Sequence, residues 1–389
     1  MRYAVIMAGG AGTRLWPMSR MNRPKQLLRF IDRPGGSGPM SLLELAARRL
    51  DGLIDPKRRY ICTGESYRAQ IREALPDFSE DRILGEPTAR DTVNAVGFAA
   101  AILEKVDKDA IFAVLTADHV IEPVEVFQER MNLGFSLVEN DPRRFVTFSI
   151  KPTYPATGFG YVERGAPVRD RKEGDKVGVD GSKVNANYVA RFVEKPDLPR
   201  AQAYVQSGDF GWNSGMFVWK ASTFLAALKK YKPESHEGLM KIQAAWGTKK
   251  ARTVLEEVYP TLPKISVDYA VLEPASKDAP KDATKDAKGC YPICTVQMDL
   301  KWLDVGSWPS FAQTLEPDAQ GNRTAGEGAS IAALSRDSLV VNAQKGHTVT
   351  VLGVEDLIVI HTPDATLVMP RARAEELKVL HGQVGDALK

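Results

Sequence analysis

Cysteine is scarce in this chain of 389 residues, where only Cys62, Cys290 and Cys294 occur. A sparse, odd set of cysteines argues against a disulfide scaffold and favours a reducing compartment, so we expect a cytoplasmic protein. Cys290 and Cys294 have no matching Cys or His pair at zinc-ligand spacing, which removes the usual indication of a structural zinc site.

A long hydrophobic run is missing as well. The longest apolar stretch, residues 95–103, is far short of the roughly 20 residues that a membrane-spanning helix requires. Residues 1–8 are too few, and too quickly followed by glycine, for a signal peptide. With 43% hydrophobic and 26% charged residues the composition is that of an ordinary globular protein, and we expect no membrane partner.

An excess of either charge is absent, because 52 Lys and Arg residues against 49 Asp and Glu residues leave a formal net charge of +3. No basic stripe interleaved with aromatic residues occurs, which argues against a nucleic-acid partner. The first 30 residues differ, since they contain six basic residues and no Asp or Glu. This run is either a basic surface arm or a local site for a polyanion.

Apolar runs and helical periodicity alternate over the first 150 residues. We predict strands at 3–8, 59–63, 82–85, 110–116 and 145–150, and helices at 41–50, 65–74, 91–106 and 124–138. Such alternation is typical of an α/β fold with a Rossmann-like, mixed but mostly parallel sheet and helices on both faces. Gly9, Glu86 and Asp118 each follow a predicted strand, and such sheets bind ligands at the carboxyl ends of their strands. We therefore expect these residues to share one crevice.

The pattern changes after residue 150. We predict strands at 158–164 and 188–194 with a charged excursion at 166–187 between them, helices at 221–230 and 249–258, and an exposed low-complexity loop at 276–288. From about residue 321, short strands at 339–341, 348–352 and 357–360 precede a closing helix at 372–380. The sequence thus predicts two domains, residues 1–318 and a small β-rich domain of residues 319–389.

The first predicted strand is followed by a glycine-rich loop with the sequence AGGAGTR at residues 8–14. Glycines allow backbone N–H groups to surround phosphate oxygens, although such a loop alone can equally be an ordinary turn. It is not a P-loop, because no Gly-Lys-Ser/Thr follows, and Leu15 stands where a dinucleotide-binding loop needs its third glycine. Arg14 and Lys25 add a planar and a compact cation that suit phosphate, which favours the polyanion site.

The longer segment 9–20, GGAGTRLWPMSR, together with PKQ at 24–26, closely resembles the signature of sugar nucleotidyltransferases. Its LWPMSR and PKQ elements are similar to the mannose-1-phosphate guanylyltransferase branch of that family. Seven further segments resemble this branch in the same order along the chain: 86–92 EPTARDT, 115–119 LTADH, 158–161 GFGY, 192–196 FVEKP, 212–217 WNSGMF, 266–270 SVDYA and 302–308 WLDVGSW. The C-terminal stretch resembles the small β-helix-like tail of the branch, which could form a homodimer surface.

The resemblance implies an enzyme that makes GDP-mannose and pyrophosphate from GTP and mannose 1-phosphate. The sugar phosphate is already an anion at neutral pH, so its oxygen can attack the α-phosphorus in line without a general base. The absence of a Ser/His/Asp or Cys/His constellation agrees with this chemistry. Two alternatives stay open: another pair of nucleotide and sugar 1-phosphate, and a non-catalytic sugar-nucleotide sensor of the same fold.

The resemblance also implies roles for individual residues. Arg14 and Lys25 would be the catalytic cations. The nucleotide would contact Gly9, Gly10, Gly12, Thr13, Glu86, Arg90, Asp91 and Thr92, and the sugar phosphate would contact Gly160, Glu194, Lys195, Asn213 and Asp268. A magnesium ion, the expected cofactor, would be held by Asp118 and Asp304.

Several of these residues have a plainer interpretation. By themselves, Asp118 and Asp304 equally fit turn or helix-cap positions, and Glu86 equally fits a solvated loop. If the resemblance holds, the Glu86 carboxylate can accept from both the N1–H and the 2-amino group of guanine, so we expect it to select GTP. Asp91 departs from the family pattern, which usually has Asn here. We expect His119 to orient a neighbour or to pack, and not to act as an acid or base.

Overall fold

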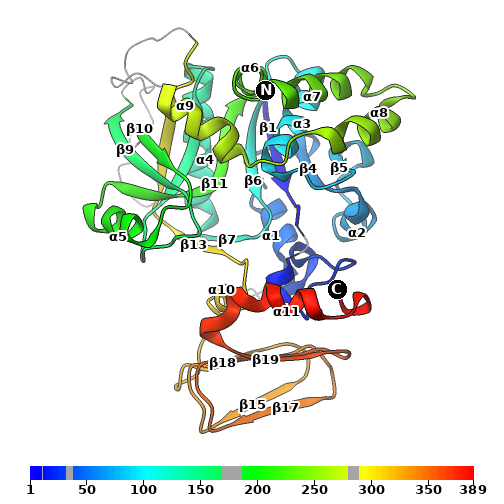
Figure 1. Cartoon of the computed structure of the whole chain (residues 1–389), viewed down its shortest axis with the longest axis vertical. Coiled ribbons are helices and arrows are strands. Elements are labelled where there is room, and N and C mark those ends of the chain that lie inside the picture. The colour runs from blue at the N-terminus through cyan, green and yellow to red at the C-terminus, as the bar shows by residue number, and fades with distance from the viewer. Residues whose placement is uncertain (11, 32–37, 169–185, 279–288) are drawn as a thin grey trace.

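The computed structural model describes residues 1–10, 12–31, 38–168, 186–278 and 289–389. Most of the predicted excursion at 166–187 and of the predicted loop at 276–288 lies outside these residues. The larger part of the molecule is built on a nine-stranded sheet with helices on both sides, and a smaller β-rich part follows it (Figure 1). Among the described residues, no helix combines the length and the apolar character needed to cross a membrane.

The large sheet is mixed. Its order is β5 (Ile83–Glu86), β4 (Arg59–Gly64), β1 (Arg2–Met7), β6 (Ile111–Thr116), β11 (Phe210–Lys220), β8 (Phe145–Ile150), β12 (Ile293–Met298), β10 (Ala186–Val193) and β9 (Tyr161–Pro167). The first four strands are parallel, as are β8 and β12, whereas β11 runs antiparallel to both of its principal neighbours. The parallel strands are nearly continuous apolar runs because both of their faces are buried.

The predicted helices form where the sequence supplies both an apolar face and a start signal. Helix α1 (Leu42–Arg48) begins at Ser41, whose hydroxyl accepts from the Glu44 N–H while the Glu44 carboxylate accepts from the Ser41 N–H. Helix α3 (Asp91–Val106) has the predicted bounds. The remaining predicted helices are α2 (Arg68–Ala74), preceded by a 3₁₀ turn, α4 (Val124–Asn140), α6 (Ala221–Tyr231) and α8 (Ala251–Val258).

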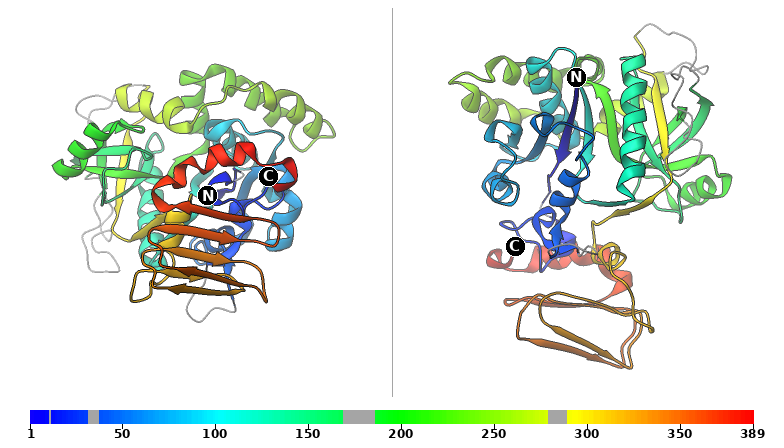
Figure 2. Two further views of the ribbon diagram at one scale, coloured as in Figure 1. Left: turned by 60° about the horizontal axis from the view of Figure 1, so that its bottom comes forward. Right: turned by 180° about the vertical axis from the view of Figure 1, so that it is seen from behind.

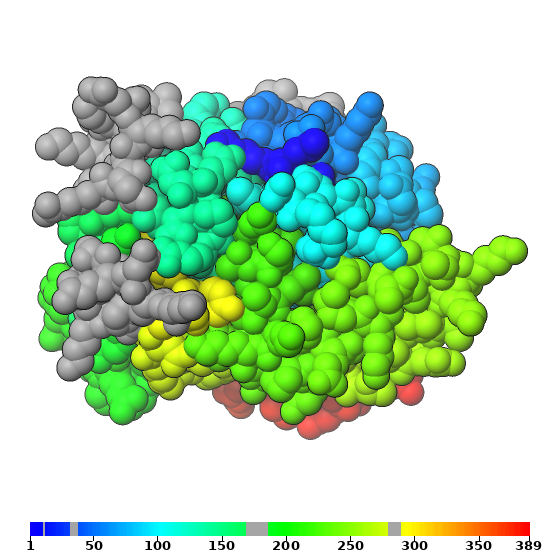
Figure 3. Space-filling model, turned by 90° about the horizontal axis from the view of Figure 1, so that it is seen from above, coloured from blue at the N-terminus to red at the C-terminus, as the bar shows by residue number. Residues whose placement is uncertain are grey.

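Several elements were not predicted. Among them are α5 (Leu198–Ser207), α7 (Pro233–Ala245), α9 (Glu273–Asp278), α10 (Trp308–Ala312), β11, β12, and the short strands β2 (Arg29–Ile31) and β3 (Met40–Ser41). Helices α6 and α7 pack over α3, α8 packs against α7, and the three form a large part of the surface seen from above (Figure 3). In that view the C-terminal segment is visible only along the lower edge.

The C-terminal part is a stack of short parallel coils (Figure 2). One side is the sheet β14 (Arg323–Ala325), β16 (Leu339–Asn342), β18 (Leu357–His361) and β19 (Thr366–Pro370), and the other pairs β15 (Ala329–Ala333) with β17 (Thr348–Leu352). The Asn342 amide, fully buried, donates at 2.9 Å to the carbonyls of Ala329, at the start of β15, and of His347, just before β17, and so supports the corner of a coil. The domain is therefore β-helix-like, as the resemblance implied.

The end of the chain differs from the predicted closing helix. The single closing helix at 372–380 is wrong in detail, because the chain forms a 3₁₀ segment, Arg371–Glu376, and only then α11 (Leu377–Gln383). The predicted domain boundary after residue 318 lies between α10 and β14 and stays a prediction.

A shared hydrophobic core joins the two parts. It contains buried residues from the signature segment, from α10 and from the C-terminal coils, among them Leu15, Trp16, Trp308, Phe311, Leu339, Ile358, Leu367 and Leu377. The Trp308 indole also donates to the Trp16 carbonyl at 2.9 Å. The conformation of the signature segment therefore depends on residues near the other end of the chain.

Gly134 in the middle of α4 gives a test of this packing. A Cβ at Gly134 would lie 2.7 Å from Cζ of Phe148, whose ring is fully buried against the sheet. Replacing glycine by alanine in a helix normally stabilises it by about 1 kcal/mol, but here we expect Gly134→Ala to be destabilising by about 1–2 kcal/mol because the overpacking outweighs that gain.

Urea unfolding measures this change, with Gly382→Ala in α11 as the matched control. Gly382 is exposed and a Cβ there would meet nothing within 4 Å, so this variant should lose no stability. A Gly134→Ala protein as stable as the parent would contradict the close helix–sheet packing.

Candidate functional site

The glycine-rich loop leaves β1 at its carboxyl end. Gly10 and Gly12 have φ angles of 92° and 68°, in the region that favours glycine. A Cβ at Gly12 would also lie 2.5 Å from the Lys25 Cβ, so this position needs glycine for space as well. No described residue accepts a hydrogen bond from the backbone N–H groups of Gly9, Gly10, Gly12 or Thr13. These groups can therefore donate to an anion.

Three polar side chains hold the loop in place, and sequence reasoning did not single them out. The Ser19 hydroxyl donates to the Gly12 carbonyl at 2.7 Å, and the buried Gln26 amide donates to the Ala8 carbonyl at 2.8 Å. The Thr63 hydroxyl reaches the same Ala8 carbonyl from β4 at 2.9 Å. Ser19 and Gln26 lie within the segments 9–20 and 24–26 that resemble the family signature. The motif therefore included these residues, but it did not indicate that they hold the loop.

Arg14 is oriented by the C-terminal part of the molecule. Its Nη1 lies 3.1 Å from both carboxylate oxygens of Glu375, which precedes α11. Within the described residues, Nε and Nη2 of Arg14 make no hydrogen bond, so they remain available to phosphate oxygens. Two further contacts bind this region together, since the Trp16 indole donates to the Leu388 carbonyl at 2.8 Å and Met21 N–H donates to the Lys389 carbonyl at 2.6 Å.

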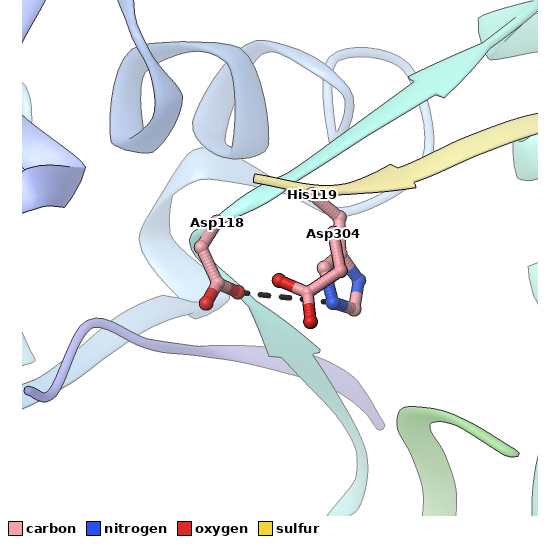
Figure 4. Close-up of side chains that lie close together, drawn as sticks. All are labelled: Asp118, His119 and Asp304. Atoms are coloured by element: carbon pink, nitrogen blue, oxygen red, sulfur yellow. Dashed lines mark ion pairs between the residues drawn. The ribbon is translucent and has the colours of Figure 1, made fainter. Parts of the chain in front are cut away.

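Asp118 and Asp304 are brought together by a two-stranded ribbon that the sequence did not predict. Strand β7 (His119–Glu122) pairs antiparallel with β13 (Lys301–Asp304), and in this register Asp304 is opposite His119. The Val305 N–H also donates to the Asp118 carbonyl at 3.0 Å. The two carboxylates face each other beside His119, and the three side chains place one potential ligand atom each within 4.8 Å of the others (Figure 4).

Lys25 completes this group from the signature segment. Its Nζ lies 2.6 Å from Asp118 Oδ2, and the lysine side chain is only 11% exposed. Burial alone would raise the pKa of Asp118, but the charge and hydrogen bond of Lys25, together with His119 when acid protonates that ring, outweigh it and hold the pKa below its ordinary range. Burial and the neighbouring Asp118 charge instead raise the pKa of Asp304 to about 6. The pair therefore has an unbalanced negative charge near neutral pH.

His119 is neutral and its tautomer is fixed. The Trp302 indole donates to His119 Nδ1 at 3.1 Å, and an indole N–H can only donate, so Nδ1 is unprotonated. Burial lowers the pKa of His119 to about 4, which keeps the ring neutral with its proton on Nε2. That atom lies 3.8 Å from Asp118 Oδ1. The geometry thus agrees with an orienting and packing neighbour, as expected, and not with a metal ligand through Nε2.

The donor set of Asp118 and Asp304 fits magnesium. Magnesium is held in proteins by one or two carboxylates together with phosphate oxygens and water. Here two partly buried carboxylates face each other, and among the described residues Lys25 is in ion-pair contact with Asp118 alone, so it does not balance the charge of both. A divalent cation would remove their mutual repulsion.

Glu86 lies at the carboxyl end of β5 and is 8% exposed, so it is not the solvated loop residue that its position before Pro87 would also allow. The Tyr259 hydroxyl donates to its Oε1 at 2.6 Å. The pKa of Glu86 is raised to about 7. Burial and the Asp91 charge raise it, and the Tyr259 hydrogen bond opposes them.

The residues after Glu86 contact the segment 259–267. The Arg90 guanidinium donates to the Pro260 carbonyl, and the Thr92 hydroxyl accepts from the Val267 N–H at 2.9 Å. Asp91 begins α3 with a φ of 62°, which Asp and Asn tolerate better than most residues, and its carboxylate accepts from the Thr92 N–H. The Asp91 side chain therefore provides a local bond of the kind that Asn would also make. Nucleotide contacts of Arg90, Asp91 and Thr92 stay predictions.

The residues expected to bind the sugar phosphate form a second group. The Asn213 amide donates to Asp268 Oδ1 at 3.0 Å, and Lys195 Nζ lies 2.5 Å from Glu194 Oε1. A Cβ at Gly160 would lie 2.5 Å from Glu194 Oε2, so glycine there allows the carboxylate to approach. Burial and the Glu194 charge raise the pKa of Asp268 to about 7. The structure therefore brings all five predicted residues together.

Aromatic side chains connect the two groups. Trp302 packs against His119 at 4.8 Å and against Phe159 at 5.4 Å between ring centroids, and Trp212 lies 6.4 Å from Trp302. Trp212 and Trp308 are buried, and Trp302 is partly exposed. These tryptophans pack between the Asp pair, the sugar-site segments and the C-terminal core.

The aspartate pair predicts an unusual effect on stability. The Asp304 pKa of about 6 is above its ordinary value of 3.8, so the folded protein retains this proton longer than the unfolded chain. The contribution of Asp304 to stability should therefore fall as the pH rises from about 4 to above 6. We expect Asp304→Asn to raise the melting temperature of the metal-free protein at pH 7.5 and to have little effect at pH 4.

Thermal unfolding with and without MgCl2 tests the same pair. Magnesium should raise the melting temperature of the parent at pH 7.5, because it relieves the repulsion, and should raise that of Asp304→Asn much less. Asp299→Asn is the control, since this exposed aspartate accepts from Gln297 and lies outside the pair. An equal response of all three proteins to magnesium would remove Asp304 from the metal site.

Comparisons with known proteins agree with this architecture. A family model described as "Nucleotidyl transferase" matches residues 3–321, and one described as "MannoseP isomerase/GMP-like beta-helix domain" matches residues 331–383. The crystal structure of a protein described as mannose-1-phosphate geranyltransferase from Thermus thermophilus is 29% identical, covers 98% of each chain and superimposes with a TM-score of 0.79.

Curated relatives extend the match over almost the whole chain. The mannose-1-phosphate guanylyltransferase of Klebsiella pneumoniae is 35% identical over 383 residues, which are 96% of this chain and 72% of that protein. A mannose-1-phosphate guanylyltransferase of Escherichia coli is 36% identical over 383 residues, with the same coverage of 96% and 72%. This chain is therefore an enzyme of the nucleotidyltransferase family, and its resemblance to the guanylyltransferase branch is confirmed.

Proposed function

We propose that this enzyme transfers GMP from GTP to mannose 1-phosphate and forms GDP-mannose and pyrophosphate. The observation that carries the choice of substrates is the identity of 35–36% over 96% of the chain with proteins named mannose-1-phosphate guanylyltransferase. The reaction type is supported by the grouping of Arg14, Lys25, Asp118 and Asp304, of which Asp118 follows the parallel strand β6 and Asp304 ends β13 of the ribbon beside it.

The reaction needs charge stabilisation more than proton transfer. An oxygen of the sugar phosphate, already ionised, attacks the α-phosphorus of GTP, and the bond from that phosphorus to the bridging oxygen of pyrophosphate breaks. Two polyanions must therefore approach each other, and negative charge must be stabilised on the leaving group. The free N–H groups of the glycine-rich loop and the cations Arg14 and Lys25 suit the triphosphate, and Lys195 suits the sugar phosphate.

Asp118 and Asp304 would hold a magnesium ion, which when bound supplies positive charge to phosphate oxygens. Lys25 then has a double role in this proposal. It neutralises part of the aspartate pair in the free enzyme, and it offers a cation to the triphosphate once the aspartates contact the metal. Lys25 is largely buried and Asp118 is partly buried, so water screens their charges weakly.

Sugar recognition is assigned to the group around Asp268. Glu194, Asn213 and Asp268 present carboxylate and amide groups, which suit the hydroxyls of a pyranose. Gly160 leaves room for the Glu194 carboxylate. Asp268 begins a π-helical turn, Asp268–Leu272, and such turns are frequent at functional sites.

Release of pyrophosphate in the presence of magnesium tests this proposal. We expect the parent enzyme to prefer GTP with mannose 1-phosphate over every other pair in a matrix of four nucleoside triphosphates and several hexose 1-phosphates. A different preferred pair would replace the proposed substrates. No turnover with any pair would instead favour a sugar-nucleotide sensor.

Arg14 gives the sharpest single-residue test. Arg14→Ala should lower kcat by about 100-fold or more, because the leaving pyrophosphate loses a charged donor. Arg336→Ala is the control, since it removes another exposed Arg–Glu pair, with Glu355 at 2.7 Å in the C-terminal coils. Equal turnover in the two variants would exclude Arg14 from the reaction.

A further inference from the structure

Tyr259 is a buried tyrosine whose hydroxyl contacts one polar group among the described residues. Its ring is 0% exposed and packs against Phe98 at 5.9 Å between centroids. Its hydroxyl donates to Glu86 Oε1 at 2.6 Å. Tyr259 begins the 3₁₀ turn Tyr259–Thr261 after α8, so it reaches Glu86 from a distant part of the sequence. Within the described part of the chain, no other donor contacts the Glu86 side chain.

The surroundings of Glu86 disfavour an ionised carboxylate. The groups that face it are Tyr259, the Cys62 thiol from β4 and the Asp91 carboxylate at the start of α3. Burial raises the pKa of Cys62 well above its usual range, so this thiol carries no charge. The nearby Arg90 donates to the Pro260 carbonyl, next to Tyr259. Tyr259 is thus the group that stabilises a negative charge on Glu86 directly.

Guanine requires that charge. An ionised carboxylate offers two acceptors for the N1–H and the 2-amino group, whereas a protonated carboxylic acid presents an O–H donor toward one of them. A carboxylate with one oxygen held by Tyr259 also has fewer orientations, so less freedom is lost when the base binds.

We propose that Tyr259 is a specificity-determining positioning residue, whose hydroxyl donates to the Glu86 carboxylate, favours its ionised form and orients it for the N1–H and 2-amino groups of guanine. This inference rests on the proposed function, because it takes GTP as the nucleotide. It adds a residue outside all the motifs in the sequence that resemble the family.

Calorimetric titration of the full-length enzyme with GTP and magnesium, without sugar phosphate, tests the inference. Tyr259→Phe keeps the ring and removes the hydroxyl, and we expect it to weaken GTP binding about tenfold at pH 7 while ATP binding is unchanged. Loss of the hydrogen bond should raise the pKa of Glu86 further, so the decline of GTP affinity with falling pH should begin at a higher pH in the variant.

Three further variants separate positioning from a general structural role. Tyr3→Phe is the matched control, because the buried Tyr3 also donates to a carboxylate, Asp107, at 3.3 Å, but at the amino-terminal end of β1. It should bind GTP like the parent. Glu86→Gln should bind GTP weakly, and adding Tyr259→Phe to it should cause little further loss, since the two residues act through one contact.

The outcomes are distinct. The inference is overturned if Tyr259→Phe keeps the GTP affinity and pH profile of the parent, or if it weakens GTP and ATP binding equally. It is also overturned if Tyr259→Phe weakens GTP binding by the same factor in the parent and in the Glu86→Gln variant. Failure of the parent enzyme to bind or use GTP would instead overturn the proposed function, and with it the role of guanine here.

Discussion

The mutual repulsion of two carboxylates is the constraint on which the site depends. The pairing of β7 with β13 holds Asp118 and Asp304 close together, although the two residues are far apart in the sequence. Lys25 contacts one of them at 2.6 Å, and Arg14 is close enough to influence the other. The ribbon that fixes the aspartates also places Trp302 against His119, which sets the tautomer of that ring. The free protein thus already holds the two carboxylates in place to bind a cation, and Arg14 and Lys25 in place to bind phosphate.

The C-terminal coils are part of this preparation and are not a separate appendage. Glu375 orients Arg14, and the carbonyls of Leu388 and Lys389 accept from the signature segment. The common hydrophobic core makes these polar contacts stable, because the signature tryptophan Trp16 is buried among residues of α10 and the coils. A substitution that loosens the packing of the coils should therefore also alter the geometry of the glycine-rich loop.

The sequence predicted those features that neighbouring residues determine. Ser41 and Glu44 form a local cap, the apolar face of 91–106 forms α3, and Gly12 stands at a turn that requires a positive φ. Asp118 was found because it follows an apolar strand. Features that need distant partners were not predictable in this way: the β7–β13 register, the Glu375 contact and the Tyr259 hydrogen bond have no local pattern. Strand β11 was missed because Gly211 and Gly215 interrupt its alternation.

The central claim is that the aspartate pair and the glycine-rich loop form one site, in which a divalent ion contacts the triphosphate. Electron spin echo spectroscopy of Mn²⁺ bound in place of magnesium, with GTP present, measures this contact directly. With ¹³C-labelled aspartate, the account predicts that Mn²⁺ in the parent couples both to phosphorus of GTP and to carboxylate carbon, and that the carbon coupling is lost in an Asp118→Asn/Asp304→Asn variant. Phosphorus coupling without carboxylate coupling in the parent, or unchanged carboxylate coupling in the variant, would contradict it.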